Sequence, residues 1–273
     1  MFEKVSPLFQ LFEKQYREAR SLTDALGKSF RSKKALELEE KLIFVDVYLH
    51  ILNKIHFKEE RLKFESFSEF RILLKALKRV HHYKLVSRTF DEEKGKVAYS
   101  LYEAFLIAEK RDLYKDVFEL IISRSPDIWE SLYATAYGYS RGIKPLTVET
   151  ATRKLIDEEV EYMHIGEKGT LESQNMRDIK EGLQVITLVE NIKIAVGLNP
   201  VFTTDVHENM RQLLKVLGKW NQTSLFAQHL NYFLSENEEV SNKYLELAKR
   251  MKAKKKRLAL EVTSLWNKLF PKM

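Results

Sequence analysis

Residues 70–79 read FRILLKALKR, and residues 210–219 read MRQLLKVLGK. One arginine, three leucines and one lysine are identical between the two stretches at a constant offset of 140. The leucines recur three and four residues apart, which is the spacing of one buried face of an α-helix. The two stretches therefore predict a pair of amphipathic helices with related sequences.

The same offset relates other parts of the chain. It carries a predicted helix at about 7–26 onto one at 147–167, and a second at 32–56 onto one at 171–197. It also brings a predicted helix at 95–124 near the start of the last one, at 238–270. Elements that recur in the same order predict an internal repeat. We expect an all-α fold of two pseudo-symmetric helical bundles packed as one unit.

This repeat also predicts the organisation of the chain. Residues 1–124 would form an N-terminal half and residues 146–273 a C-terminal half, joined by a connecting segment at 125–145. Further helices are expected at 67–90, 126–142, 205–220 and 225–234, with a break of the fourth helix near Asp112. The chain has only five prolines and nine glycines, which favours long helices over a protein with many turns.

The composition excludes several classes of protein. The 273 residues contain no cysteine, so thiol catalysis, disulfides and cysteine-ligated metals are excluded. The N-terminal residues lack an apolar signal sequence, and no run approaches the ~18 apolar residues that a membrane helix needs. We therefore expect a cytoplasmic protein without a membrane partner.

The positive charge is concentrated in one place. The net charge is +7, and residues 249–257 contain seven lysines and arginines but no acid, so the rest of the chain is neutral overall. A nucleic-acid-binding protein usually spreads its charge along a surface, so a nucleic acid partner is not expected. The cluster predicts either a solvated helix face or a docking site for an acidic protein.

Each of the two related helices carries a stripe of basic residues. Residues four apart are displaced by only about 40° around a helix. The two stripes consist of Arg71, Lys75 and Arg79, and of Arg211, Lys215 and Lys219. Like charges at this spacing repel by about a few tenths of a kcal/mol, and phosphate oxygens would offset that cost. The stripes thus indicate either an anionic ligand or ordinary amphipathic helices whose basic side is exposed to solvent.

One lysine interrupts the apolar stripe of the last predicted helix. The stripe consists of Val240, Tyr244, Leu247, Met251, Leu258, Val262, Leu265 and Leu269. A step of four residues after Met251 arrives at Lys255. Such a lysine must extend to solvent, pair with an acid or face a polar cavity. We count Lys255 among the candidate anion-binding residues.

The long helices, the repeat and the run His207-x-x-x-Arg211-x-x-x-Lys215-x-x-x-Lys219 resemble the CHAD family, the conserved-histidine α-helical domains. The resemblance implies two four-helix bundles related by a pseudo-twofold axis. It also implies binding of inorganic polyphosphate through histidine, arginine and lysine side chains. It would assign that role to His207, Arg211 and Lys215, with Arg71, Lys75 and Arg79 as counterparts in the first half.

The chain departs from the family pattern at two points. Phe67 occupies the position that corresponds to His207 in the first half. The family usually places basic residues three and seven positions after the histidine, where this chain has Met210 and Leu214. One residue is about 100° of helix rotation, so this shift implies a divergent member of the family with weakened or lost phosphate binding.

No sequence motif indicates an enzyme. A nucleophile elbow, a P-loop and a dinucleotide-binding glycine pattern are all absent from the sequence. We therefore expect no catalytic residues, no metal and no cofactor. Three hypotheses remain, in order of preference: a non-enzymatic module that binds a phosphate polyanion, a protein-interaction scaffold that uses residues 249–257, and a helical enzyme with an unrecognised site.

Overall fold

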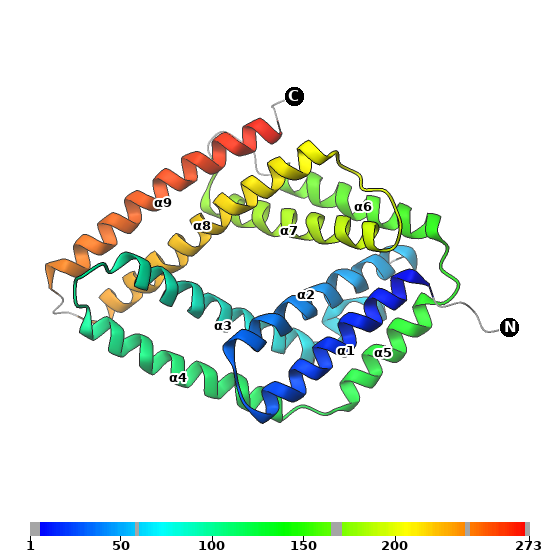
Figure 1. Ribbon diagram of the computed structural model, residues 1–273, viewed down its shortest axis with the longest axis horizontal. Coiled ribbons are helices and arrows are strands. Elements are labelled where there is room, and N and C mark those ends of the chain that lie inside the picture. Colours follow the sequence, from blue (N-terminus) through cyan, green and yellow to red (C-terminus); the bar gives the residue numbers. More distant parts are fainter. Residues whose placement is uncertain (1–5, 58–59, 165–170, 238–240, 271–273) are drawn as a thin grey trace. The chain divides into compact units, whose positions relative to one another are not determined.

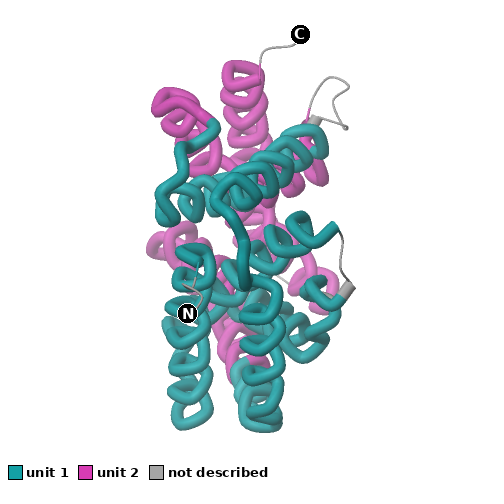
Figure 2. The backbone as a smooth tube through the Cα atoms, turned by 90° about the vertical axis from the view of Figure 1, so that its right-hand side faces the viewer, with its two compact units in different colours: residues 1–80, 114–162, 184–201 teal, residues 81–113, 163–183, 202–273 magenta. Residues whose placement is uncertain are grey.

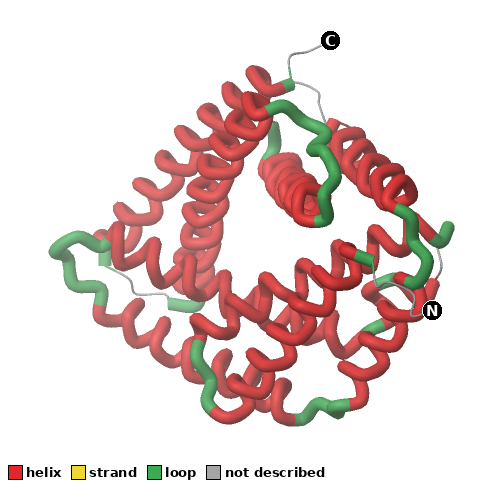
Figure 3. Tube along the Cα trace, turned by 45° about the vertical axis from the view of Figure 1, so that its right-hand side comes forward, coloured by secondary structure: helices red, strands yellow, loops and turns green. Residues whose placement is uncertain are grey.

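All regular secondary structure in the described part of the chain is helical (Figure 3). The structure is a computed structural model that describes residues 6–57, 60–164, 171–237 and 241–270. The prediction of an all-α protein is confirmed.

The helices follow one another with short connections (Figure 1). They are α1 (Pro7–Lys28), α2 (Ser32–Ile55), α3 (Ser68–Glu93), α4 (Ser100–Ile122), α5 (Asp127–Ser140), α6 (Pro145–His164), α7 (Ser173–Ala195), α8 (Thr204–Ser235) and α9 (Asn242–Leu269). Two short 3₁₀ segments, η1 (Glu60–Leu62) and η2 (Phe64–Ser66), precede α3 and were not predicted.

The first helix begins as its sequence predicts. Ser6 is the N-cap of α1, and its hydroxyl accepts a hydrogen bond of 3.2 Å from the backbone N–H of Phe9. Pro7 occupies the first helical position, where no backbone N–H is needed. The helix was predicted to end at about residue 26, and α1 instead continues through Gly27 to Lys28.

Two predicted helix breaks are wrong. Helix α4 runs without interruption past Asp112. Helix α8 continues through the polar run at residues 221–224, where two helices were expected. Thr223 and Ser224 are buried, and the Thr223 hydroxyl donates to the Lys219 carbonyl at 2.8 Å, so these polar groups are accommodated within the helix.

Helix α7 buries a charged side chain and exposes an apolar one next to it. Ile194 is 55% exposed, whereas the neighbouring Lys193 is completely buried. The Lys193 ammonium donates to the Glu149 carboxylate of α6 at 2.7 Å. This ion pair explains why a lysine occupies an inward position on the helix.

The chain forms two compact units (Figure 2). Unit 1 comprises residues 1–80, 114–162 and 184–201, and unit 2 comprises residues 81–113, 163–183 and 202–273. These units are not the two predicted halves, because each unit draws on both halves and α3, α4, α6 and α7 contribute to both units. The halves stay a prediction from the repeat.

Aromatic side chains form much of the core of unit 1, where α1, α2 and α5 pack together. Phe12 of α1 stacks on Tyr48 of α2 with ring centroids 4.4 Å apart. The Tyr48 hydroxyl is hydrogen-bonded to the Ser140 hydroxyl, and Tyr16 donates to the Trp129 carbonyl at 2.9 Å. The core of this unit is therefore held by specific polar contacts as well as by apolar packing.

Helices α8 and α9 lie side by side in unit 2. The predicted apolar stripe of α9 is confirmed at Tyr244, Leu247, Met251, Leu258 and Val262, which are all buried. Leu265 and Leu269 are half-buried, and Val240 lies outside the described residues. The stripe faces the protein interior, so the exposed charged residues of α9, such as Lys252 and Lys256, lie on the other sides of the helix.

Candidate anion-binding residues

The first basic stripe lies on α3 in unit 1. Arg71, Lys75 and Arg79 are exposed, whereas Leu73 and Leu77 on the other side of the helix are fully buried. The predicted division of this helix into a basic face and an apolar face is confirmed. A solvated basic face of this kind is available to an anion.

The second basic stripe lies on α8 in unit 2. Arg211, Lys215 and Lys219 are exposed, and Leu213 and Leu217 are fully buried. Each of these residues has the same burial class as its counterpart 140 positions earlier. The two stripes belong to different units.

At the start of α8, Arg211 and His207 each contact a nearby side chain. Arg211 donates to the Glu208 carboxylate one turn earlier, and both side chains are exposed, so the pair contributes little to stability. The ring of His207 is half-buried and lies edge-on to Phe202, with centroids 6.3 Å apart. An anion would compete with Glu208 for Arg211.

Lys255 occupies the most unusual position of the candidate residues. Its ammonium lies over the ring of the fully buried Trp220, 5.6 Å from the centroid. This geometry is a cation–π contact between α9 and α8. Burial lowers the pKa of Lys255, and the positive charge of Arg177 lowers it further. Within the described residues, no carboxylate forms an ion pair with Lys255.

Arg177 is a candidate that the sequence analysis missed. It lies near the start of α7, is exposed and forms no ion pair within the described segments of the chain. The positive charge of Arg177 acts on Lys255 and contributes to its lowered pKa. The repeat offers no signal for this residue, because its counterpart 140 positions earlier is Glu37. Only the folded chain brings Arg177 to Lys255.

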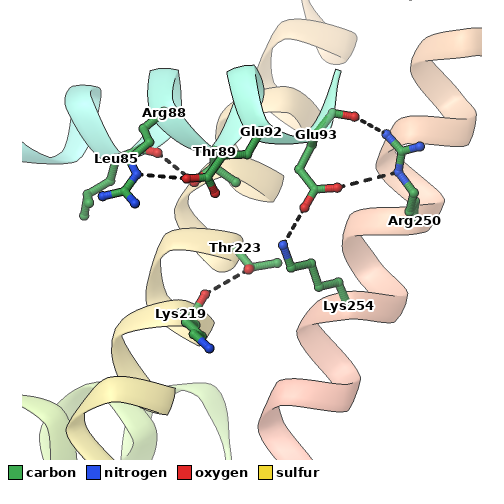
Figure 4. Close-up of polar contacts among 9 residues, drawn as sticks. All are labelled: Leu85, Arg88, Thr89, Glu92, Glu93, Lys219, Thr223, Arg250 and Lys254. Carbon is green, nitrogen blue, oxygen red and sulfur yellow. Dashed lines mark hydrogen bonds and ion pairs between the residues drawn. The ribbon is translucent and has the colours of Figure 1, made fainter. Parts of the chain in front are cut away.

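Part of the basic cluster at 249–257 is used inside unit 2 (Figure 4). Glu93, at the end of α3, accepts from Lys254 and lies 3.8 Å from Nε of Arg250. Arg250 also donates to the Glu93 backbone carbonyl at 2.5 Å. Glu93 thereby links α9 to α3 and neutralises part of the cluster.

Apart from Lys255, the remaining cations of the cluster face solvent. Lys249 pairs with Glu246 at 3.0 Å, with both side chains exposed. Lys252, Lys256 and Arg257 are exposed and form no ion pair within the described residues. The cluster is therefore divided between contacts that fix α9 and cations that are available to a partner.

The described residues contain no group of three or more histidine, cysteine, aspartate or glutamate side chains that could hold a metal ion. None of the described helices is both long and apolar enough to cross a membrane. Comparisons of the chain with models of protein families, with curated proteins and with solved structures found no match. The resemblance to the CHAD family therefore stays a prediction from the sequence.

Proposed function

We propose that this chain is a non-enzymatic module that binds a phosphate polyanion such as inorganic polyphosphate. Lys255 and Arg177 would make the innermost contacts. The observation that carries the proposal is the position of the Lys255 ammonium on Trp220, beside a second cation and without an ion-pairing carboxylate in the described chain.

The positive charge of Lys255 is not compensated by a carboxylate in the described part of the chain. Lys255 loses solvation through burial, and Arg177 repels it. A phosphate oxygen would offset both effects, because it accepts a charge-assisted hydrogen bond from the ammonium and another from the guanidinium. Binding would raise the pKa of Lys255 towards its ordinary value.

The basic stripe on α8, in the same unit as Lys255, would extend this site along a polymer, and the stripe on α3 would offer separate contacts in unit 1. Successive members of each stripe are one turn apart, which corresponds to a rise of about 6 Å along the helix axis. Their contacts would be exposed and would release counterions, so affinity should fall steeply with salt. His207 would contribute a donor at the start of the second stripe, and the Glu208–Arg211 pair would weaken binding there.

The proposal includes the two related halves and the CHAD-like architecture. Its support is the order of the helices, with α5 between two sets of four. The first residues of α1 and α6 are 138 positions apart, those of α2 and α7 are 141, those of α3 and α8 are 136, and those of α4 and α9 are 142. In addition, a cytoplasmic location is proposed from the absence of cysteine.

A thermal-shift experiment tests the proposed ligand. A phosphate polymer should raise the melting temperature at low salt, and orthophosphate at the same total phosphate concentration should raise it less. The double variant Arg177→Gln/Lys255→Gln should lose most of the shift. Lys268→Gln, which changes an exposed lysine on the same helix, should keep it. Equal shifts in all three proteins would contradict the assignment of these residues.

A second candidate function is a scaffold that docks an acidic protein on the outer face of α9. The supporting observation is that Lys252, Lys256 and Arg257 are exposed, with Leu245 and Leu260 exposed on the same helix at 44% and 60%. An acidic amphipathic peptide would bind through both kinds of side chain. Binding that is lost on Lys252→Gln/Lys256→Gln, but unaffected by Arg177→Gln/Lys255→Gln, would favour this function.

A further inference from the structure

Helices α1 and α5 border an open cleft in unit 1 that none of the sequence motifs identified. Its volume is about 520 Å³, which lies within the usual range of small-molecule sites. Its lining consists of two tyrosines, two arginines, three carboxylates and a serine: Tyr16, Tyr133, Arg17, Arg20, Glu13, Asp24, Glu130 and Ser21. The cleft is separate from the residues assigned to the polyanion.

The aromatic part of the cleft is held in a fixed position. The rings of Tyr16 and Tyr133 have centroids 5.2 Å apart. The Tyr16 hydroxyl donates to the Trp129 carbonyl at 2.9 Å, and the Tyr133 hydroxyl donates to Glu13 at 3.0 Å. Two rings anchored at their hydroxyl ends offer a preorganised surface for an aliphatic chain or a cation.

One pair of charges in the cleft is already compensated. The Glu13 carboxylate accepts from Arg17 at 2.8 Å as well as from Tyr133. Arg20, Asp24 and Glu130 differ, because none of them forms an ion pair within the described part of the protein. Two negative charges and one positive charge are therefore open to a ligand.

These charges converge on the same region of the cleft. Burial raises the pKa of Tyr16, a hydrogen bond and the charge of Arg20 lower it, and the charge of Glu130 raises it. Arg20 on α1 and Glu130 on α5 both line the cleft together with Tyr16, and they form no ion pair with each other. Asp24 lies one helical turn beyond Arg20.

We propose that this cleft binds a basic amino acid, a ligand with one carboxylate and two cationic groups. Arg20 would bind the α-carboxylate, and Asp24 and Glu130 would bind the two ammonium groups. The methylene chain would lie against Tyr16 and Tyr133. This ligand class matches the uncompensated charges in both sign and number, whereas a simple anion or a diamine would leave at least one of them unmatched.

Three probes of nearly equal size test the charge requirement: L-lysine, L-norleucine, which lacks the side-chain ammonium, and cadaverine, which lacks the carboxylate. Isothermal titration calorimetry at low ionic strength should show that lysine binds the full-length protein at least about tenfold more tightly than either analogue. Equal binding of all three probes, or no lysine binding up to ~10 mM, would overturn the proposal.

Substitutions test which residues cause the preference for lysine over each of the two analogues. Arg20→Gln should abolish the difference between lysine and cadaverine, and Asp24→Asn/Glu130→Gln should abolish the difference between lysine and norleucine. Arg153→Gln changes an exposed arginine on α6 and should leave all three affinities unchanged. Unaltered selectivity in the cleft variants, with circular dichroism showing that they are folded, would also reject the site.

Discussion

Lys193 and Glu149 form a buried ion pair, and we predict that removing Glu149 costs more stability than removing the charge of Lys193. Lys193 is completely buried, whereas the side chain of Glu149 is 34% exposed, and they are joined at 2.7 Å. Glu149→Ala leaves the buried ammonium without its partner. Loss of one partner of a buried pair generally costs about 3–5 kcal/mol. Because water reaches Glu149, we expect the lower cost of about 2–3 kcal/mol here.

The reverse substitution should be much less costly. Lys193→Met keeps most of the apolar stem and removes the charge, and it leaves a carboxylate that water can solvate. We expect its free energy of unfolding to lie within about 1 kcal/mol of the wild-type value. The double variant should resemble Lys193→Met, which corresponds to a coupling energy equal in size to the cost of Glu149→Ala, about 2–3 kcal/mol.

Urea unfolding followed by far-ultraviolet circular dichroism measures these differences, provided that the m-value is unchanged. Glu161→Ala, at an exposed position on the same helix as Glu149, is the matched control and should change stability by less than about 0.5 kcal/mol. Additive effects of the two substitutions, or a larger loss for Lys193→Met than for Glu149→Ala, would refute the reasoning.

Two further predictions concern the cores and the link between α3 and α9. Burial raises the pKa of Tyr48 and Tyr102, so their stabilising effect is complete below about pH 10. Above that pH it is lost by up to about 1.4 kcal/mol per pH unit for each tyrosine. In unfolding experiments at a series of pH values, Tyr48→Phe and Tyr102→Phe should each reduce the slope with which the free energy of unfolding falls at alkaline pH. Tyr232→Phe, at a 56% exposed position, should leave that slope unchanged. Glu93→Gln removes the carboxylate shared by two cations of α9 and should lower the free energy of unfolding by about 1 kcal/mol. Glu246→Gln, in an exposed pair, should have almost no effect, and equal losses would show that the link is unimportant.

The sequence predicts the helical elements well because their residue patterns are local. The leucines at 73, 77, 213 and 217 are all fully buried, as their spacing requires. The failures occur where a long-range contact overrides a local pattern. The break expected in α8 is absent because tertiary packing buries Thr223. Residue types alone do not reveal such packing.

The candidate sites were less predictable than the helices. Lys255 was found because it interrupts an apolar stripe, which is a signal within a single helix. No pattern within a single helix marks Arg177 or the cleft lined by Tyr16 and Glu130. Glu130 is 114 positions after Tyr16, so only the packing of α5 on α1 brings their charges and rings together.

The most direct test of the proposed function is a titration of the protein with a short phosphate polymer, followed by nuclear magnetic resonance of the lysine and arginine side chains. We predict that the Lys255 ammonium and the Arg177 guanidinium shift at the lowest polymer concentrations, and that the shifts disappear at high salt. Shifts confined to Lys252, Lys256 and Arg257, or no shifts at all, would contradict the account.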